Sequence, residues 1–118
     1  MTTPADAARI REFADGMPGG VRGFVELFVT HTTAAARELR AAVQQGNAAD
    51  IQAVAHRSIG SSAACGAVRL TQLLREVETA GRDGRLDGID ARVGELEAEL
   101  SRVHAFLQAL GDQEPPPV

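Results

Sequence analysis

The sequence contains no lysine, tryptophan or tyrosine, and phenylalanine is its only large aromatic residue. Arginine therefore supplies all 12 basic residues, which against 16 acidic residues leave a formal net charge of -4. The arginines form no basic cluster, so the electrostatic footprint of a nucleic-acid-binding protein is missing. We therefore expect no nucleic-acid partner.

Long apolar segments are also missing. No stretch approaches the roughly 18 apolar residues of a membrane span, and the N-terminus lacks the charged start and apolar run of a signal peptide. The single cysteine, Cys65, cannot form an internal disulfide, as is usual in a reducing compartment. These absences predict a soluble, cytoplasmic protein with no membrane partner.

What the chain does contain is helical periodicity. Its 118 residues, rich in alanine and leucine, fit one helical domain. Apolar residues recur at helical spacing in four segments, near 21–45, 48–64, 70–81 and 89–110. Because only short polar breaks separate these segments, we expect an all-α fold, an antiparallel four-helix bundle.

Both ends of the chain lie outside these four segments. A short additional N-terminal helix is expected to begin with Thr3 as its capping residue and Pro4 at its first position, and to lie as a lid across one end of the bundle. The domain is expected to cover residues 1–111. Residues 112–118, which end in three prolines and a valine, are expected to form a disordered tail.

A single histidine stands at the centre of the 48–64 segment. On a helix, His56 shares its face with Gln52, Ala53, Ile59, Gly60 and Ala63. Glycine inside a helix costs about 0.5 to 1 kcal/mol relative to alanine, and at Gly60 it leaves room for a protein backbone or a phosphoryl group to reach the imidazole. The opposite face is expected to contact the core through Ile51, Val54, Ala55, Ser58, Ser62 and Cys65.

The segment from His56 to Leu70 resembles the signature of histidine-containing phosphotransfer (Hpt) domains, H-x-L-K-G-S-S-x-x-x-G-A-x-x-L. The matching positions are His56, Gly60, Ser61, Ser62, Gly66, Ala67 and Leu70. The resemblance covers about residues 20–110 and implies a helical bundle. It also implies that His56 accepts a phosphoryl group and relays it to or from an aspartate of a response-regulator receiver domain.

Two positions depart from this signature, because Ser58 and Ile59 replace the usual leucine and lysine. The second change removes a cation that the family often places beside the phosphoryl group, and Arg82 or Arg57 are candidates to replace it. The resemblance further implies that Glu78, on the following helix, accepts a hydrogen bond from the imidazole. We therefore regard Glu78, Arg82, Arg57 and Gly60 as supporting residues for His56.

The resemblance also implies the partners of the chain. A protein of this family carries phosphoryl groups without independent turnover, between a hybrid sensor histidine kinase and a response regulator, and it does so as a monomer. No metal site and no cofactor are expected in the chain itself, because Mg2+ would come from the partner receiver domain. The expected docking patch around His56 comprises Gln52, Ala53, Ile59 and Ala63, with Ile59 enlarging its apolar part.

Two other functions remain open from the residues alone. One is a phosphorylation-independent helical-bundle adaptor that binds a receiver domain or a kinase, which the missing lysine favours. The other is the dimerisation and phosphoacceptor part of a sensor kinase, although that class usually places an acidic residue directly after its histidine, where this chain has Arg57. A dimer in solution would favour the second of these.

The remaining reactive side chains are expected to be structural or solvated. Neither His31 nor His104 has a glutamate three positions earlier, as a metal site in a helical bundle requires. Serines inside helices, such as Ser61 and Ser62, commonly bond back to the main chain. Cys65 has no second cysteine to react with and is expected to pack as a small apolar residue.

Overall fold

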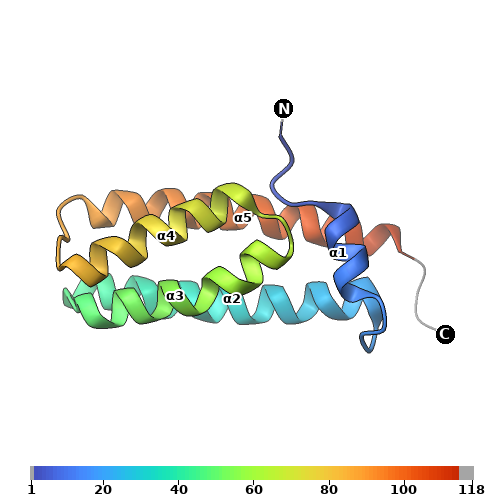
Figure 1. The fold of residues 1–118 in the computed structure, drawn as a ribbon, viewed down its shortest axis with the longest axis horizontal. Coiled ribbons are helices and arrows are strands. Elements are labelled where there is room, and N and C mark those ends of the chain that lie inside the picture. Colours follow the sequence, from blue (N-terminus) through green and yellow to red (C-terminus); the bar gives the residue numbers. More distant parts are fainter. Residues whose placement is uncertain (1, 115–118) are drawn as a thin grey trace.

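The computed structural model describes residues 2–114, and this part of the chain forms five helices. They are α1 (Ala7–Ala14), α2 (Gly20–Gln45), α3 (Ala48–Ala64), α4 (Val68–Asp83) and α5 (Ile89–Gln113). The four long helices run alternately up and down the bundle, and α1 lies near one end of it (Figure 1). This arrangement confirms the predicted all-α, four-helix bundle with a short additional N-terminal helix.

A tight turn joins α2 to α3. Gly46 adopts a left-handed conformation with φ of 65°, and its N–H donates to the carbonyl groups of Ala42 and Val43. Asn47 then caps α3, because its side-chain oxygen accepts from the N–H of Asp50 at 3.1 Å. These two residues therefore end one helix and begin the next, as the polar break in the sequence predicts.

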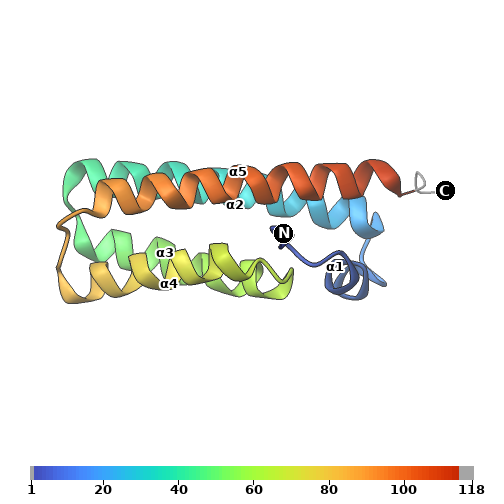
Figure 2. The same cartoon turned by 90° about the horizontal axis from the view of Figure 1, so that it is seen from above.

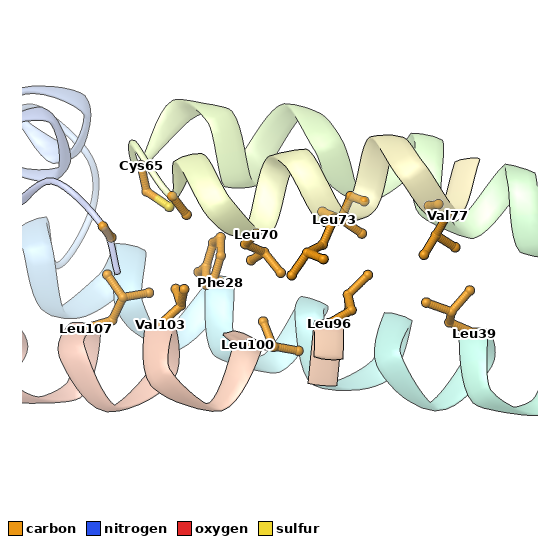
Figure 3. Close-up of a cluster of buried hydrophobic side chains, with 14 of the residues drawn as sticks. Phe28, Leu39, Cys65, Leu70, Leu73, Val77, Leu96, Leu100, Val103 and Leu107 are labelled. Atoms are coloured by element: carbon orange, nitrogen blue, oxygen red, sulfur yellow. The ribbon is translucent and has the colours of Figure 1, made fainter. Parts of the chain in front are cut away.

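The core lies along the axis of the bundle, between α5 and the other long helices (Figure 3). The regular apolar stripe of α5 is buried along its whole length, at Ile89, Val93, Leu96, Leu100, Val103, Leu107 and Leu110. Buried residues of α4 and α2 complete this core, among them Leu70, Leu73, Val77, Phe28 and Leu39. Because burial of one such side chain contributes about 1.5 to 3 kcal/mol, this core is the main stabiliser of the bundle.

The N-terminal segment differs from the sequence prediction. Helix α1 begins at Ala7 and is capped by Asp6, whose Oδ1 accepts from two main-chain N–H groups of the first turn, at 3.0 and 3.3 Å. Thr3 instead donates from its hydroxyl to the carbonyl of Ala5 at 2.7 Å. The expected cap at Thr3 with Pro4 as the first helical residue is therefore wrong, because Ala5 is buried against the bundle and precedes the helix.

This docked segment holds α1 at the turn between α3 and α4. The N–H of Asp6 donates to the carbonyl of Cys65 at 3.0 Å. Gly66 lies directly beneath it with φ of +70°, and a Cβ at Gly66 would stand 2.6 Å from the Cβ of Asp6. Helix α1 packs against α2 and α3, next to the end of the α3–α4 pair, as expected for a lid (Figure 2).

Helix α5 extends further than expected. It continues to Gln113, so Asp112 and Gln113 are helical, and the prediction that the tail begins at residue 112 is wrong. Glu114 follows and forms an ion pair with Arg11 of α1 at 3.0 Å. The rest of the predicted tail, residues 115–118, lies outside the described residues.

Within residues 2–114, none of the helices combines the length and the apolar character that crossing a membrane requires.

Candidate functional site

The candidate site lies on the pair of helices α3 and α4, which approach each other closely. Gly81 of α4 is buried, and a Cβ at this position would stand 2.7 Å from the main-chain nitrogen of Gln52 and 2.8 Å from the carbonyl oxygen of Ala48. Further along the pair, the buried hydroxyls of Ser62 and Thr71 lie 2.9 Å apart. These two contacts fix the register of the antiparallel helices on both sides of His56.

His56 projects from α3 beside Glu78 of α4. Nδ1 of the imidazole forms a hydrogen bond with Oε2 of Glu78. The His56 side chain is 77% exposed, whereas the Glu78 side chain is only 19% exposed. Because a carboxylate accepts, Nδ1 is the donor, and this bond orients the ring and leaves Nε2 directed away from Glu78.

The two faces of α3 differ as the sequence indicates. Buried residues on the inner face are Ile51, Val54, Ala55, Ser62 and, just after the helix, Cys65, while Ser58 is half-buried. Of the residues expected to dock a partner, Ala53 is exposed, whereas Gln52, Ile59 and Ala63 are half-buried. Ile59 packs against the core rather than standing free on the surface. A Cβ at exposed Gly60 would meet nothing within 4 Å, so the surface there is open.

The two candidate cations have carboxylate partners of their own. Arg57 forms an ion pair with Glu38 of α2 at 2.6 Å, and Arg82 lies 3.5 Å from the neighbouring Asp83. The structure therefore brings Glu78 to His56 but gives neither arginine a contact with the imidazole. The partner of Arg57 was missed by sequence reasoning, because the ion pair joins two helices whose relative rotation the sequence does not specify.

Two further residues of the site were also missed. Thr71 and Gly81 stand where the apolar stripe of α4 meets α3, and each interrupts that stripe with a small or polar residue. Such interruptions are the signal that could have indicated a close helix crossing. In the sequence, Gly81 indicates only the end of the 70–81 segment, whereas α4 continues past it to Asp83.

The other reactive side chains have structural surroundings. Because the Thr32 hydroxyl donates to the carbonyl of Phe28 at 2.6 Å, Nε2 of His104 is the donor in its own 2.7 Å bond to Thr32. Burial lowers the pKa of the His104 imidazole and raises the pKa of the Cys65 thiol. Within residues 2–114, no group of three or more His, Cys, Asp or Glu side chains is arranged to hold a metal ion.

The structure thus combines an antiparallel helical bundle with an exposed histidine that a carboxylate orients. The model of the Hpt domain matches residues 23–106. The chain therefore belongs to the Hpt domain family, whose members carry phosphoryl groups on a histidine in phosphorelays.

A solved structure is similar over nearly the whole chain. The crystal structure of histidine-containing phosphotransfer protein B from Pseudomonas aeruginosa PAO1 covers 98% of this chain and 100% of its own, with a TM-score of 0.88. The two sequences are 24% identical, so this likeness concerns the fold. The comparison with curated protein sequences gave no match.

Proposed function

We propose that this protein accepts a phosphoryl group on Nε2 of His56 and exchanges it with the aspartate of a response-regulator receiver domain. The observation that carries the proposal is the hydrogen bond from His56 Nδ1 to Glu78 at an exposed position of the bundle. Because Glu78 holds the proton on one ring nitrogen, the lone pair of the other nitrogen is available as the nucleophile.

The transfer step requires no other group of this chain to form or break a bond. The Nε2 lone pair attacks the phosphorus of the aspartyl phosphate, and the Nε2–P bond forms as the P–O bond to the aspartate breaks. The aspartate leaves as a carboxylate with the bonding electron pair. The proton stays on Nδ1, where the carboxylate of Glu78 stabilises the positive charge that develops on the ring. The reverse step returns the group to aspartate.

The remaining components belong to the partners. In this proposal the receiver domain brings a magnesium ion, which neutralises charge on the phosphoryl oxygens. The chain is then a carrier without independent turnover, acting as a cytoplasmic monomer between a hybrid sensor histidine kinase and a response regulator.

The α3 surface around His56 suits such a partner. Ala53 and Gly60 are exposed and small, and nothing would lie within 4 Å of a Cβ at Gly60, so a receiver can approach the imidazole closely. Half-buried Gln52, Ile59 and Ala63 complete this proposed docking surface. The ion pairs of Arg57 and Arg82 are largely exposed, and such pairs contribute only about 0.2 to 1 kcal/mol, so either arginine can exchange its carboxylate for phosphoryl oxygens.

The test is phosphotransfer from a panel of phosphorylated receiver domains to the native chain, to His56→Gln and to His31→Gln. His31 is exposed on α2 and serves as the matched control. We expect acid-labile label on the native chain and on His31→Gln, and none on His56→Gln. Binding of a receiver without label on any of the three would overturn the carrier role and favour the phosphorylation-independent adaptor.

A further inference from the structure

A second arginine of α4 stands at the same level as the position where the signature has lysine. The contacts of Glu78 with His56 and of Thr71 with Ser62 show that α3 and α4 run antiparallel. A residue three positions before Glu78 is therefore at the same level along the helix pair as a residue three positions after His56. These residues are Arg75 and Ile59.

The spacing of residues along α4 places Arg75 on the side of this helix that borders α3. It follows Thr71 by four positions and precedes Glu78 by three, so it belongs to the stripe of α4 that borders α3. Its side chain is exposed and borders a surface groove between α4 and the start of α5, which Glu76 and Arg92 also line. Because the side chain is exposed, it can turn from this groove toward α3 without displacing the core.

Among the described residues, the guanidinium of Arg75 forms no ion pair. Of the arginines on α3 and α4, three have a carboxylate within 4.0 Å: Arg57 pairs with Glu38, Arg69 with Glu95 and Arg82 with Asp83. Among the described residues, Arg75 has no such partner. An unpaired guanidinium presents its five N–H donors to any anion that comes within reach.

The α3 residue at the level of Arg75 carries no charge of its own. Ile59, at the level of Arg75, is half-buried and packs against the core, so it does not project over the surface as a lysine would. On the side of His56 that borders α4, the next α3 residues are Ile59 and Ala63, and both are half-buried. Neither is a long polar side chain, so a guanidinium from α4 can approach phosphoryl oxygens on His56 from this side.

We propose that Arg75 supplies the cation that holds the phosphoryl group of phosphorylated His56. Its guanidinium donates two N–H bonds to phosphoryl oxygens and so provides from α4 the positive charge that Ile59 cannot provide from α3. The inference rests on the proposed phosphorylation of His56. Arg75 acts on the transferring group itself, because charge neutralisation is the main requirement of phosphoryl transfer.

The first test compares Arg75→Gln with Arg69→Gln in single-turnover transfer from a saturating phosphorylated receiver. Arg69 lies on the same helix but pairs with Glu95 of α5, so its variant is the matched control. We expect transfer to Arg75→Gln to be about tenfold slower, Arg75→Lys to recover part of the rate, and Arg69→Gln to stay within about twofold of the native chain.

The second test needs no receiver. In a His31→Gln background, the chain is phosphorylated with phosphoramidate and the phosphohistidine is titrated by 31P NMR. A nearby guanidinium favours the dianionic phosphoryl group, so Arg75→Gln is expected to raise its pKa by about half a unit, with no change in Arg69→Gln. A role limited to folding would leave this titration unchanged.

The two proposals fail in different ways. If the native chain takes no label from any receiver, the proposed function is wrong. If the native chain is labelled and Arg75→Gln shows both the native rate and the native 31P titration, the role of Arg75 alone is wrong.

Discussion

At the residue scale, the chemistry depends on which ring nitrogen of His56 is free and on how much room surrounds it. Glu78 is mostly shielded from solvent while His56 is mostly exposed, so the carboxylate orients the ring from below without covering it. Gly60 keeps the adjoining surface bare. Glu78 and Gly60 therefore leave His56 accessible and oriented, as the proposed phosphotransfer requires.

Replacing Glu78 tests the orientation of the imidazole. We expect Glu78→Ala to slow phosphotransfer to His56 by about tenfold, because the ring loses the acceptor that selects its tautomer, whereas Glu78→Gln retains an amide oxygen and loses less. Glu76→Ala is the control, since Glu76 pairs with Arg92 of α5. The measurement is the single-turnover rate. Equal rates in Glu78→Ala and Glu76→Ala would contradict the orienting role.

Replacing Gly60 separates stability from access. Gly60→Ala is expected to raise the free energy of unfolding by about 0.5 to 1 kcal/mol, because alanine favours the helix and the added methyl group meets nothing. Gly60→Leu is expected to slow transfer from a receiver at least about tenfold by covering the approach to His56. Urea denaturation and transfer rates measure the two effects.

Gly94 of α5 provides the control for this pair of variants, because a Cβ there also meets nothing within 4 Å. Gly94→Leu should leave transfer unchanged. If Gly60→Leu transfers as fast as Gly94→Leu, the surface over Gly60 is not the route of approach.

At the element scale, the α3–α4 pair is the unit that builds the site. Its register depends on the buried hydroxyl pair of Ser62 and Thr71 at one end and on the close crossing at Gly81 at the other. Both contacts lie within two helical turns of the His56–Glu78 bond. The geometry of the site therefore follows from how closely these two helices pack.

Gly81→Ala tests the close crossing. The added Cβ would stand 2.7 Å from a main-chain nitrogen and 2.8 Å from a main-chain oxygen of α3, and main-chain atoms cannot turn aside. We expect the free energy of unfolding to fall by about 1 to 3 kcal/mol, and transfer to slow because Glu78 moves away from His56. Urea denaturation checks the first effect. A stability equal to that of Gly60→Ala would show that the helices separate at no cost.

At the scale of the whole molecule, α2 and α5 form a long pair that extends beyond α3 and α4, and α1 occupies the space beside their overhang (Figures 1 and 2). His104 of α5 and Thr32 of α2 join this pair through a 2.7 Å hydrogen bond next to Phe28. A half-buried histidine in this position couples the stability of the bundle to pH.

The sign of this coupling follows from burial. In the folded protein, burial lowers the pKa of His104 below its ordinary value of 6.5. Between the two values the unfolded chain binds more protons, so the free energy of unfolding falls as the pH drops through 6.5, and the loss is complete below the folded-state pKa. We expect His104→Gln to lose less stability than the native chain as the pH falls through 6.5 toward the lowered folded-state pKa of His104.

Urea denaturation at several pH values measures this difference, with His31→Gln as the control because His31 is exposed. Parallel pH profiles of the native chain and His104→Gln would contradict the contribution of His104.

The sequence by itself determined the helices and singled out His56 as the proposed acceptor. Helical periodicity and capping are local properties, so the span of α3 and the buried stripe of α5 follow from the spacing of residues along the chain. The Hpt signature is equally local, because it lies within α3, the turn that follows and the first residues of α4. The local pattern gave the wrong start for the N-terminal helix. Asp6 donates its N–H to the carbonyl of Cys65, and the helix begins after it, at Ala7.

Only the tertiary structure decided which side chains meet between helices. How the helices are rotated and aligned decides the pairing of Arg57 with Glu38, the partial burial of Ile59 and the close crossing at Gly81. The same alignment decides which residue of α3 is level with Arg75. Periodicity specifies which face of a helix is buried, but many rotations and registers bury the same apolar stripe. Packing of small residues such as Gly81 selects one of them, and that choice sets the surroundings of His56.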